Sequence, residues 1–93
     1  MTIFSQIASK IIKEQELVIG PLAWNEAGKV PGLNITDQKS GEVNISGEPK
    51  ETLDKLVAQY ERLFGRASHE VCREAAISLI ADLPATEVPA SLR

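Results

Sequence analysis

The residues of this sequence best able to do chemistry together are His69 and Cys72, its single histidine and its single cysteine. They stand three positions apart in a segment with helical periodicity, so their side chains can share one helix face. An imidazole close to a thiol favours the thiolate, which is the nucleophilic form. One hypothesis is therefore a thiol-dependent enzyme or a redox-sensitive protein, on condition that Cys72 is partly exposed.

The second interpretation gives both residues a place in the fold and no catalytic role. Cys72 lies on the apolar stripe of its segment, as a small buried side chain would, and His69 would then be exposed in the first helical turn. We favour this interpretation and predict no catalytic residues, no metal and no cofactor. A zinc site would need carboxylates to complete its ligands, and the six glycines are too scattered for a phosphate-binding loop.

The segment Ala67–Glu70, followed by Arg73, resembles the phospho-accepting box of sensor histidine kinases. The resemblance covers about seven residues and implies a phosphorylated His69. The Thr-Pro continuation of that family is missing, and Gly65 interrupts the helix just before the box. Because the sequence also contains no nucleotide-binding region, we do not expect phosphotransfer.

Helices with apolar residues every three or four positions must position these side chains. We predict a helix over residues 2–16 with Thr2 as N-cap, a second over 21–29 begun by Pro21, a third from Pro49 to Phe64, and a last one capped by Ser68 and ending before Pro84. Gly65 is predicted to end the third helix, so that a three-residue turn joins the last two.

Between the second and third predicted helices, two short segments alternate apolar and polar residues with a period of two. This pattern predicts an antiparallel hairpin with Gly41 in its connecting loop. If Leu33 faces Ile45 and Ile35 faces Val43, all four apolar side chains fall on one side. The predicted fold class is therefore α+β: two helices, a hairpin and a C-terminal pair of helices, with a single layer of helices packed on the hairpin.

The whole sequence is long enough for one domain with one core. We assign residues 1–83 to that domain. Residues 84–93 contain two prolines and no periodicity, so we predict a flexible C-terminal tail.

Charge and hydropathy limit the possible partners. The net charge is −3, with ten basic residues scattered among thirteen acidic ones, which argues against nucleic acid; DNA binding through the last two helices is the least favoured alternative. No stretch approaches the ~20 apolar residues of a spanning helix, so we predict no membrane partner. The first residues lack the pattern of a secretory signal, and the expected location is the cytoplasm.

The remaining prediction is a small protein-interaction or regulatory module without catalytic activity. A two-stranded hairpin leaves unpaired backbone groups at its edges, so a second copy could pair with one edge and form a homodimer. Trp24 is either a residue at the edge of the core or a partly exposed anchor for a partner. The candidate interaction residues are Trp24, Leu33, Ile35, Val43 and Ile45.

Overall fold

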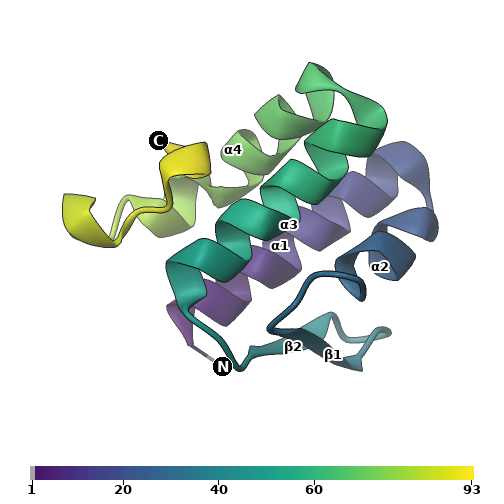
Figure 1. Cartoon of the computed structure of the whole chain (residues 1–93), viewed down its shortest axis with the longest axis horizontal. Coiled ribbons are helices and arrows are strands. Elements are labelled where there is room, and N and C mark those ends of the chain that lie inside the picture. The colour runs from purple at the N-terminus through teal and green to yellow at the C-terminus, as the bar shows by residue number, and fades with distance from the viewer. Residues whose placement is uncertain (1) are drawn as a thin grey trace.

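The structure, a computed structural model, describes residues 2–93 and has the predicted order of helices and strands (Figure 1). The elements are α1 (Ile3–Ile19), α2 (Leu22–Ala27), β1 (Leu33–Asp37), β2 (Glu42–Ile45), α3 (Pro49–Phe64) and α4 (Arg66–Ile80), followed by two 3₁₀ turns, η1 (Ala85–Glu87) and η2 (Ala90–Leu92). The α+β class is therefore confirmed.

Side-chain caps fix the starts of the two long helices α1 and α3. The Thr2 hydroxyl accepts a hydrogen bond from the Ser5 N–H at 3.1 Å, which confirms the predicted N-cap. The Glu48 carboxylate accepts one from the Glu51 N–H at 2.7 Å. Each bond satisfies a backbone donor that has no partner within the helix.

Several predicted helix boundaries differ from the structure. Helix α1 continues to Ile19, beyond the predicted end at residue 16, and Pro21 is the N-cap of α2 and not its first residue. Helix α2 ends at Ala27 and not at 29, because Gly28 serves as its C-cap. Helix α4 begins at Arg66 without a side-chain cap, so Ser68 lies buried inside its first turn. The only link between α3 and α4 is Gly65, with φ 89° and ψ −175°. This conformation is nearly restricted to glycine, and it turns the chain within one residue.

The hairpin has the predicted register, with Leu33 opposite Ile45 and Ile35 opposite Val43. An irregularity between Ile35 and Asp37 then shifts the pairing. At the tip, the Ser9 hydroxyl of α1 donates to the Gly41 carbonyl at 2.5 Å, which fastens the hairpin to the helix.

The core lies where α1 contacts α2, β2, α3 and α4. Its largest fully buried side chains include Tyr60, Ile7, Ile11, Ile12, Leu53 and Leu56. Tyr60 also donates its hydroxyl proton to the Ala23 carbonyl at 2.6 Å. The aliphatic composition of this core agrees with the scarcity of aromatic residues in the sequence.

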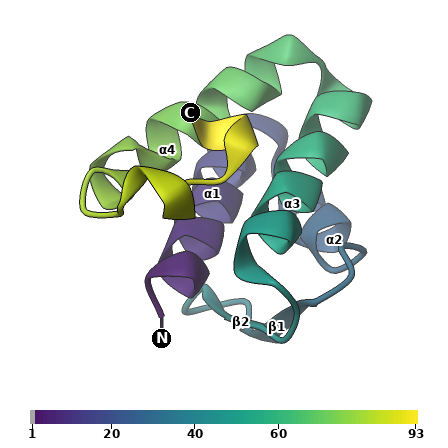
Figure 2. The same ribbon diagram turned by 60° about the vertical axis from the view of Figure 1, so that its left-hand side comes forward.

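The C-terminal segment 84–93, predicted as a flexible tail, lies folded against the helices (Figure 2). Turn η2 contacts both α3 and α4, and Leu92 is 2% exposed. Pro84 and Pro89 hold extended angles, with ψ of 146° and 141°, which lead the chain back across the helices. A single apolar anchor of this kind has no periodicity, so the sequence pattern could not reveal it.

Candidate functional site

The structure brings the predicted interaction residues of the hairpin into the molecule's own core. Leu33 and Val43 are buried, while Ile35 and Ile45 are half-buried and pack against the core cluster. Trp24 is 3% exposed, so it occupies the core and offers no surface to a partner in this conformation. The hairpin thus keeps only its backbone edges and its outer polar face for contact.

The outer face of the hairpin is polar. Asn34 and Asn44 are opposite one another and exposed. The Thr36 hydroxyl lies 3.0 Å from the Glu42 carbonyl oxygen and 2.9 Å from the Glu42 carboxylate. Only three regular residue pairs precede the irregularity in β1. An edge this short offers a second copy few backbone groups for strand pairing.

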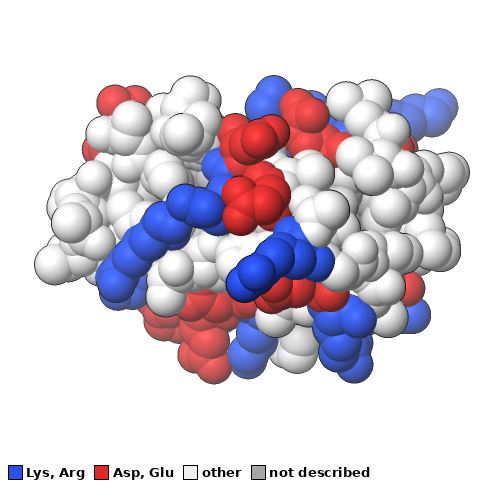
Figure 3. Space-filling model, turned by 90° about the horizontal axis from the view of Figure 1, so that it is seen from above, with Lys and Arg blue, Asp and Glu red and all other residues white. Residues whose placement is uncertain are grey.

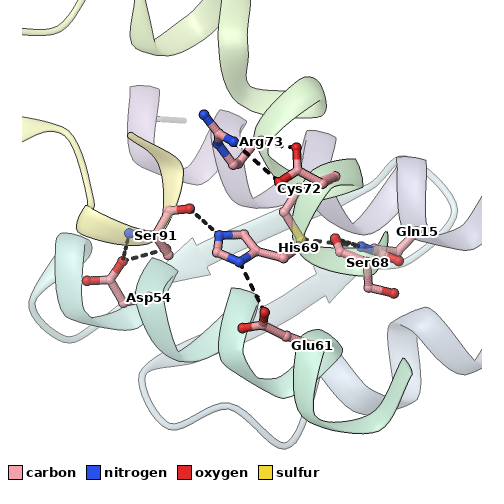
Figure 4. Close-up of polar contacts among 9 residues, drawn as sticks. Gln15, Asp54, Glu61, Ser68, His69, Cys72, Arg73 and Ser91 are labelled. Atoms are coloured by element: carbon pink, nitrogen blue, oxygen red, sulfur yellow. Dashed lines mark hydrogen bonds and ion pairs between the residues drawn. The ribbon is translucent and has the colours of Figure 1, made fainter. Parts of the chain in front are cut away.

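His69 and Cys72 do not form a pair, and their side chains point apart (Figure 4). The Cys72 thiol is fully buried and accepts a hydrogen bond from the Gln15 side-chain amide at 3.3 Å. Burial raises the pKa of Cys72 to about 11, and this opposes formation of a thiolate. The structure therefore gives the thiol-enzyme alternative no support.

His69 is partly buried and not exposed as predicted, because it joins α3, α4 and the C-terminal segment (Figure 4). Its Nε2 is 2.6 Å from the Ser91 carbonyl oxygen, so Nε2 carries the proton and donates it. Its Nδ1 is 3.2 Å from the Glu61 carboxylate, a contact that becomes an ion pair when the imidazole is protonated.

Asp54 of α3 holds the same C-terminal segment. One of its carboxylate oxygens accepts both the Ser91 hydroxyl, at 2.6 Å, and the Ser91 N–H, at 3.1 Å. Leu92 next to it is buried between α3 and α4. Asp54 and His69 thus contact one residue, Ser91, from two helices.

The end of the molecule opposite the hairpin carries apolar side chains in solvent, which sequence analysis missed. We call Leu17, Val18, Leu22 and Leu63 the turn-end patch. Leu17 is 80% exposed and Val18 63%, and the other two are close to half exposed. Leu17 falls beside the apolar stripe of α1, and Leu22 falls beside that of α2. Leu63 shares the helical spacing of the core residues of α3, and Val18 lies beyond the predicted end of the first helix. A position beside the core stripe was therefore an available signal for Leu17 and Leu22 only.

Both interhelical turns, at Gly20 and at Gly65, lie at this end (Figure 1). Gln15, near the end of α1, donates to the Ser68 carbonyl near the start of α4 at 2.8 Å. Gln59, in the last part of α3, donates to the Glu26 carboxylate of α2 at 2.7 Å. These contacts bring the end of α1, the start of α4, the end of α3 and α2 together. The two turns and the patch thus lie at the same end of the molecule.

A broad area without Lys, Arg, Asp or Glu covers this end, on the right of Figure 3, with charged side chains at its border. Beside Leu17 and Val18, a hollow of about 390 Å³ lies between α1 and α4, lined also by Lys10, Glu14 and Val71. The patch therefore adjoins a concave surface into which a partner's side chain can fit.

Within residues 2–93, no three His, Cys, Asp or Glu side chains gather closely enough to hold a metal ion. In the same range, no helix has the length and apolar character needed to cross a membrane. Three comparisons with known proteins found no match to the chain, whether among family models, curated proteins or solved structures.

Proposed function

We propose that this chain is a small protein-interaction or regulatory module that acts without catalysis and binds a second copy of itself through the turn-end patch. The observation that carries the proposal is the exposure of four aliphatic side chains at one end of the molecule. Contiguous exposed apolar surface on a small domain is a mark of protein contact sites. In this proposal the chain works in the cytoplasm, where a free thiol such as Cys72 stays reduced.

A second copy is the occupant favoured by the charges around the patch. Acidic Glu14 and Glu16 lie on α1, while basic Arg62 and Arg66 lie on either side of the turn between α3 and α4. In a twofold dimer each surface meets its own copy, so the acidic side of one patch can face the basic side of the other. An apolar centre with both charge signs at its border is therefore self-complementary.

The hairpin edge remains the competing surface for a homodimer. It would use backbone hydrogen bonds and form a four-stranded sheet, as the sequence suggests. The turn-end patch is favoured because its apolar side chains are not covered by other residues of the described chain, whereas Leu33 and Val43 are already buried. The two surfaces lie at opposite ends, so separate variants can test them.

Light scattering after size-exclusion chromatography, from about 10 to 500 μM, is the direct test; at these concentrations a dimer becomes visible when its association is favourable by about 5 kcal/mol or more. We expect the wild-type chain to dimerise, Leu17→Asp to remain a monomer, and Asn44→Lys at the hairpin edge to dimerise as wild type does. The opposite pattern, dissociation by Asn44→Lys alone, assigns the dimer to the hairpin. A wild-type monomer throughout the range rejects the homodimer.

Thiol labelling separates this module from the enzyme alternative. A nucleophilic Cys72 would react with a disulfide reagent at neutral pH in the folded protein. Because the thiol is fully buried, we expect reaction only as fast as the chain opens, and therefore much faster in denaturant. Rapid stoichiometric reaction of the native chain would restore the thiol-enzyme hypothesis.

A further inference from the structure

The C-terminal segment sits on the helices as a bound peptide does. Its polar contacts near the end are made by a single residue, Ser91, through its N–H, its hydroxyl and its carbonyl oxygen. Its apolar contact is the buried anchor Leu92, preceded by the buried Pro89. Residues 84–87 before them are exposed and connect the segment to the end of α4. They form turn η1, and the Thr86 carbonyl accepts a hydrogen bond from the Lys50 side chain at 2.8 Å. These are the features of a docked segment: a buried apolar anchor, hydrogen bonds to both backbone groups of one residue, and an exposed connection to the rest of the chain.

We propose that the surface between α3 and α4 is a recognition site for a peptide of the type Pro-x-Ser-Leu from a partner protein, bound as a 3₁₀ turn, and that residues 89–92 occupy it in the absence of that partner. Asp54 recognises the hydroxyl and N–H of the peptide serine, and His69 recognises its carbonyl oxygen. The slot that holds Leu92 selects an aliphatic side chain at the next position.

The docked segment leaves part of this surface unused, and that part gives a partner its advantage. A hollow of about 410 Å³ adjoins Leu92 and Arg93 and is lined by Ile77 and Ile80 of α4. Ile77 is 65% exposed there. A peptide with a large apolar residue directly after its leucine can cover Ile77, which the chain's own Arg93 leaves in solvent. The added apolar contact lets such a peptide displace a segment that is held by a short linker.

The covalent connection sets the binding affinity that a partner peptide needs in order to displace the chain's own segment. A short connection holds its end at an effective concentration in the millimolar range or above. A peptide identical to the chain's own segment therefore competes poorly with it at micromolar concentration. Weakening the internal segment should open the site to the same peptide added from outside. This site is independent of the turn-end patch, because it lies between α3 and α4 under η2.

Isothermal titration calorimetry with the full chain tests the proposal. The probes are a synthetic peptide with the sequence of residues 84–93, the same peptide with Arg93→Phe, and the same peptide with Leu92→Ala as the matched control. The proteins are wild type, Leu92→Ala and Ser91→Asp. The last variant keeps the leucine anchor but brings a second carboxylate next to Asp54, so it weakens docking without opening a cavity.

We expect both protein variants to bind the unmodified peptide about 10- to 100-fold more tightly than wild type does, the range given by loss of one buried aliphatic contact. The Arg93→Phe peptide should bind more tightly than the unmodified one, and the Leu92→Ala peptide about 10- to 100-fold more weakly. Circular dichroism should show both variants folded.

Three results overturn the proposal. If both variants unfold, residues 89–92 are part of the core and are not a displaceable occupant of the site. Folded variants that bind none of the peptides leave the surface without a recognition function. A wild-type dimer that becomes monomeric in both variants identifies a second copy, exchanging its C-terminal segment, as the occupant. The third result would also reassign the dimer from the turn-end patch to this surface. After either of the first two results the turn-end patch remains as proposed, because Leu17→Asp does not touch this surface.

Discussion

At the hairpin end, Leu33 and Val43 turn their side chains into the core and leave asparagines outside, whereas at the turn end Leu17 and Val18 extend theirs into solvent. The apolar side of the hairpin packs against the core of its own domain. The turn end has apolar side chains beyond those that the core needs. A small domain can thus use one end for stability and keep the other for association, and substitutions at the two ends should have different effects.

The largest effect expected from this comparison is the contrast between Leu33→Ala and Leu17→Ala. Truncating the buried Leu33 removes its contacts and leaves a cavity, so the free energy of unfolding should fall by about 2–5 kcal/mol. Leu17 is 80% exposed, and its truncation should change the free energy by no more than about 0.5 kcal/mol. Urea unfolding monitored by circular dichroism measures both. Similar losses in the two variants would show that the turn end is stabilising surface.

High pH should destabilise the molecule through two buried groups, the Cys72 thiol and the Tyr60 hydroxyl. Burial raises the pKa of Cys72 to about 11 from its usual value near 9, and burial also raises the pKa of Tyr60. In both cases the folded chain holds the proton more tightly than the unfolded chain. The stabilisation from Cys72 is complete below pH 9 and is lost as the pH rises to about 11, whereas the stabilisation from Tyr60 begins to be lost only above pH 10, the usual pKa of tyrosine. For Cys72 alone the loss is at most about 2–3 kcal/mol.

Denaturant midpoints at intervals between pH 8 and 11 check this expectation. Cys72→Ala should begin less stable, because it loses the contact with Gln15, and should then decline less steeply over the same interval. A parallel decline in the variant and in wild type would assign the pH dependence to other groups.

The turns of this end depend on backbone conformation more than on packing. Gly65 has a φ of 89°, and a side-chain carbon placed there would meet nothing within 4 Å. We expect Gly65→Ala to cost about 1–3 kcal/mol from backbone strain alone. Gly28→Ala is the matched control, because Gly28 has ordinary helical angles and space for a methyl group. The control should be neutral or stabilising by up to about 1 kcal/mol. Thermal melting of the two variants decides whether the strain is real.

The smallest effect concerns the outer face of the hairpin. Asn44 is exposed in β2, where a β-branched residue suits the pleated surface better. Asn44→Thr should therefore stabilise the chain by about 0.2–1 kcal/mol, and Val18→Thr at the turn end should change stability by less than about 0.5 kcal/mol while reducing association. Differential scanning calorimetry with light scattering resolves the pair. Destabilisation by Asn44→Thr would show that this face has contacts of its own.

The hairpin and the helical stripes could be predicted from the sequence, because local periodicity decides which side of each element is apolar. The register of Leu33 with Ile45 followed from that alternation alone. The single-residue link at Gly65 could not be predicted, since the same glycine is equally suited to a longer turn. The docking of Leu92 also escaped, because it depends on two helices that meet only in the folded chain.

Among the candidate residues, the sequence left two roles open for Trp24 and two for Cys72, and burial decided in both cases for the core. Leu17 and Val18 were not singled out, because an exposed aliphatic residue becomes noticeable only when its neighbours are known. Ser91 and Asp54 are 37 positions apart, and nothing in their local sequence connects them.

The burial of Trp24 has a practical consequence for following this protein in solution. It is the single tryptophan of the chain, so excitation at long wavelength gives emission from one known place in the core. A tryptophan shielded from water emits at shorter wavelength than one in solvent, and unfolding should therefore shift the emission to the red. Detachment of residues 89–92, on the other side of α3 and α4, should leave that emission nearly unchanged. One fluorophore can thus distinguish global unfolding from release of the C-terminal segment.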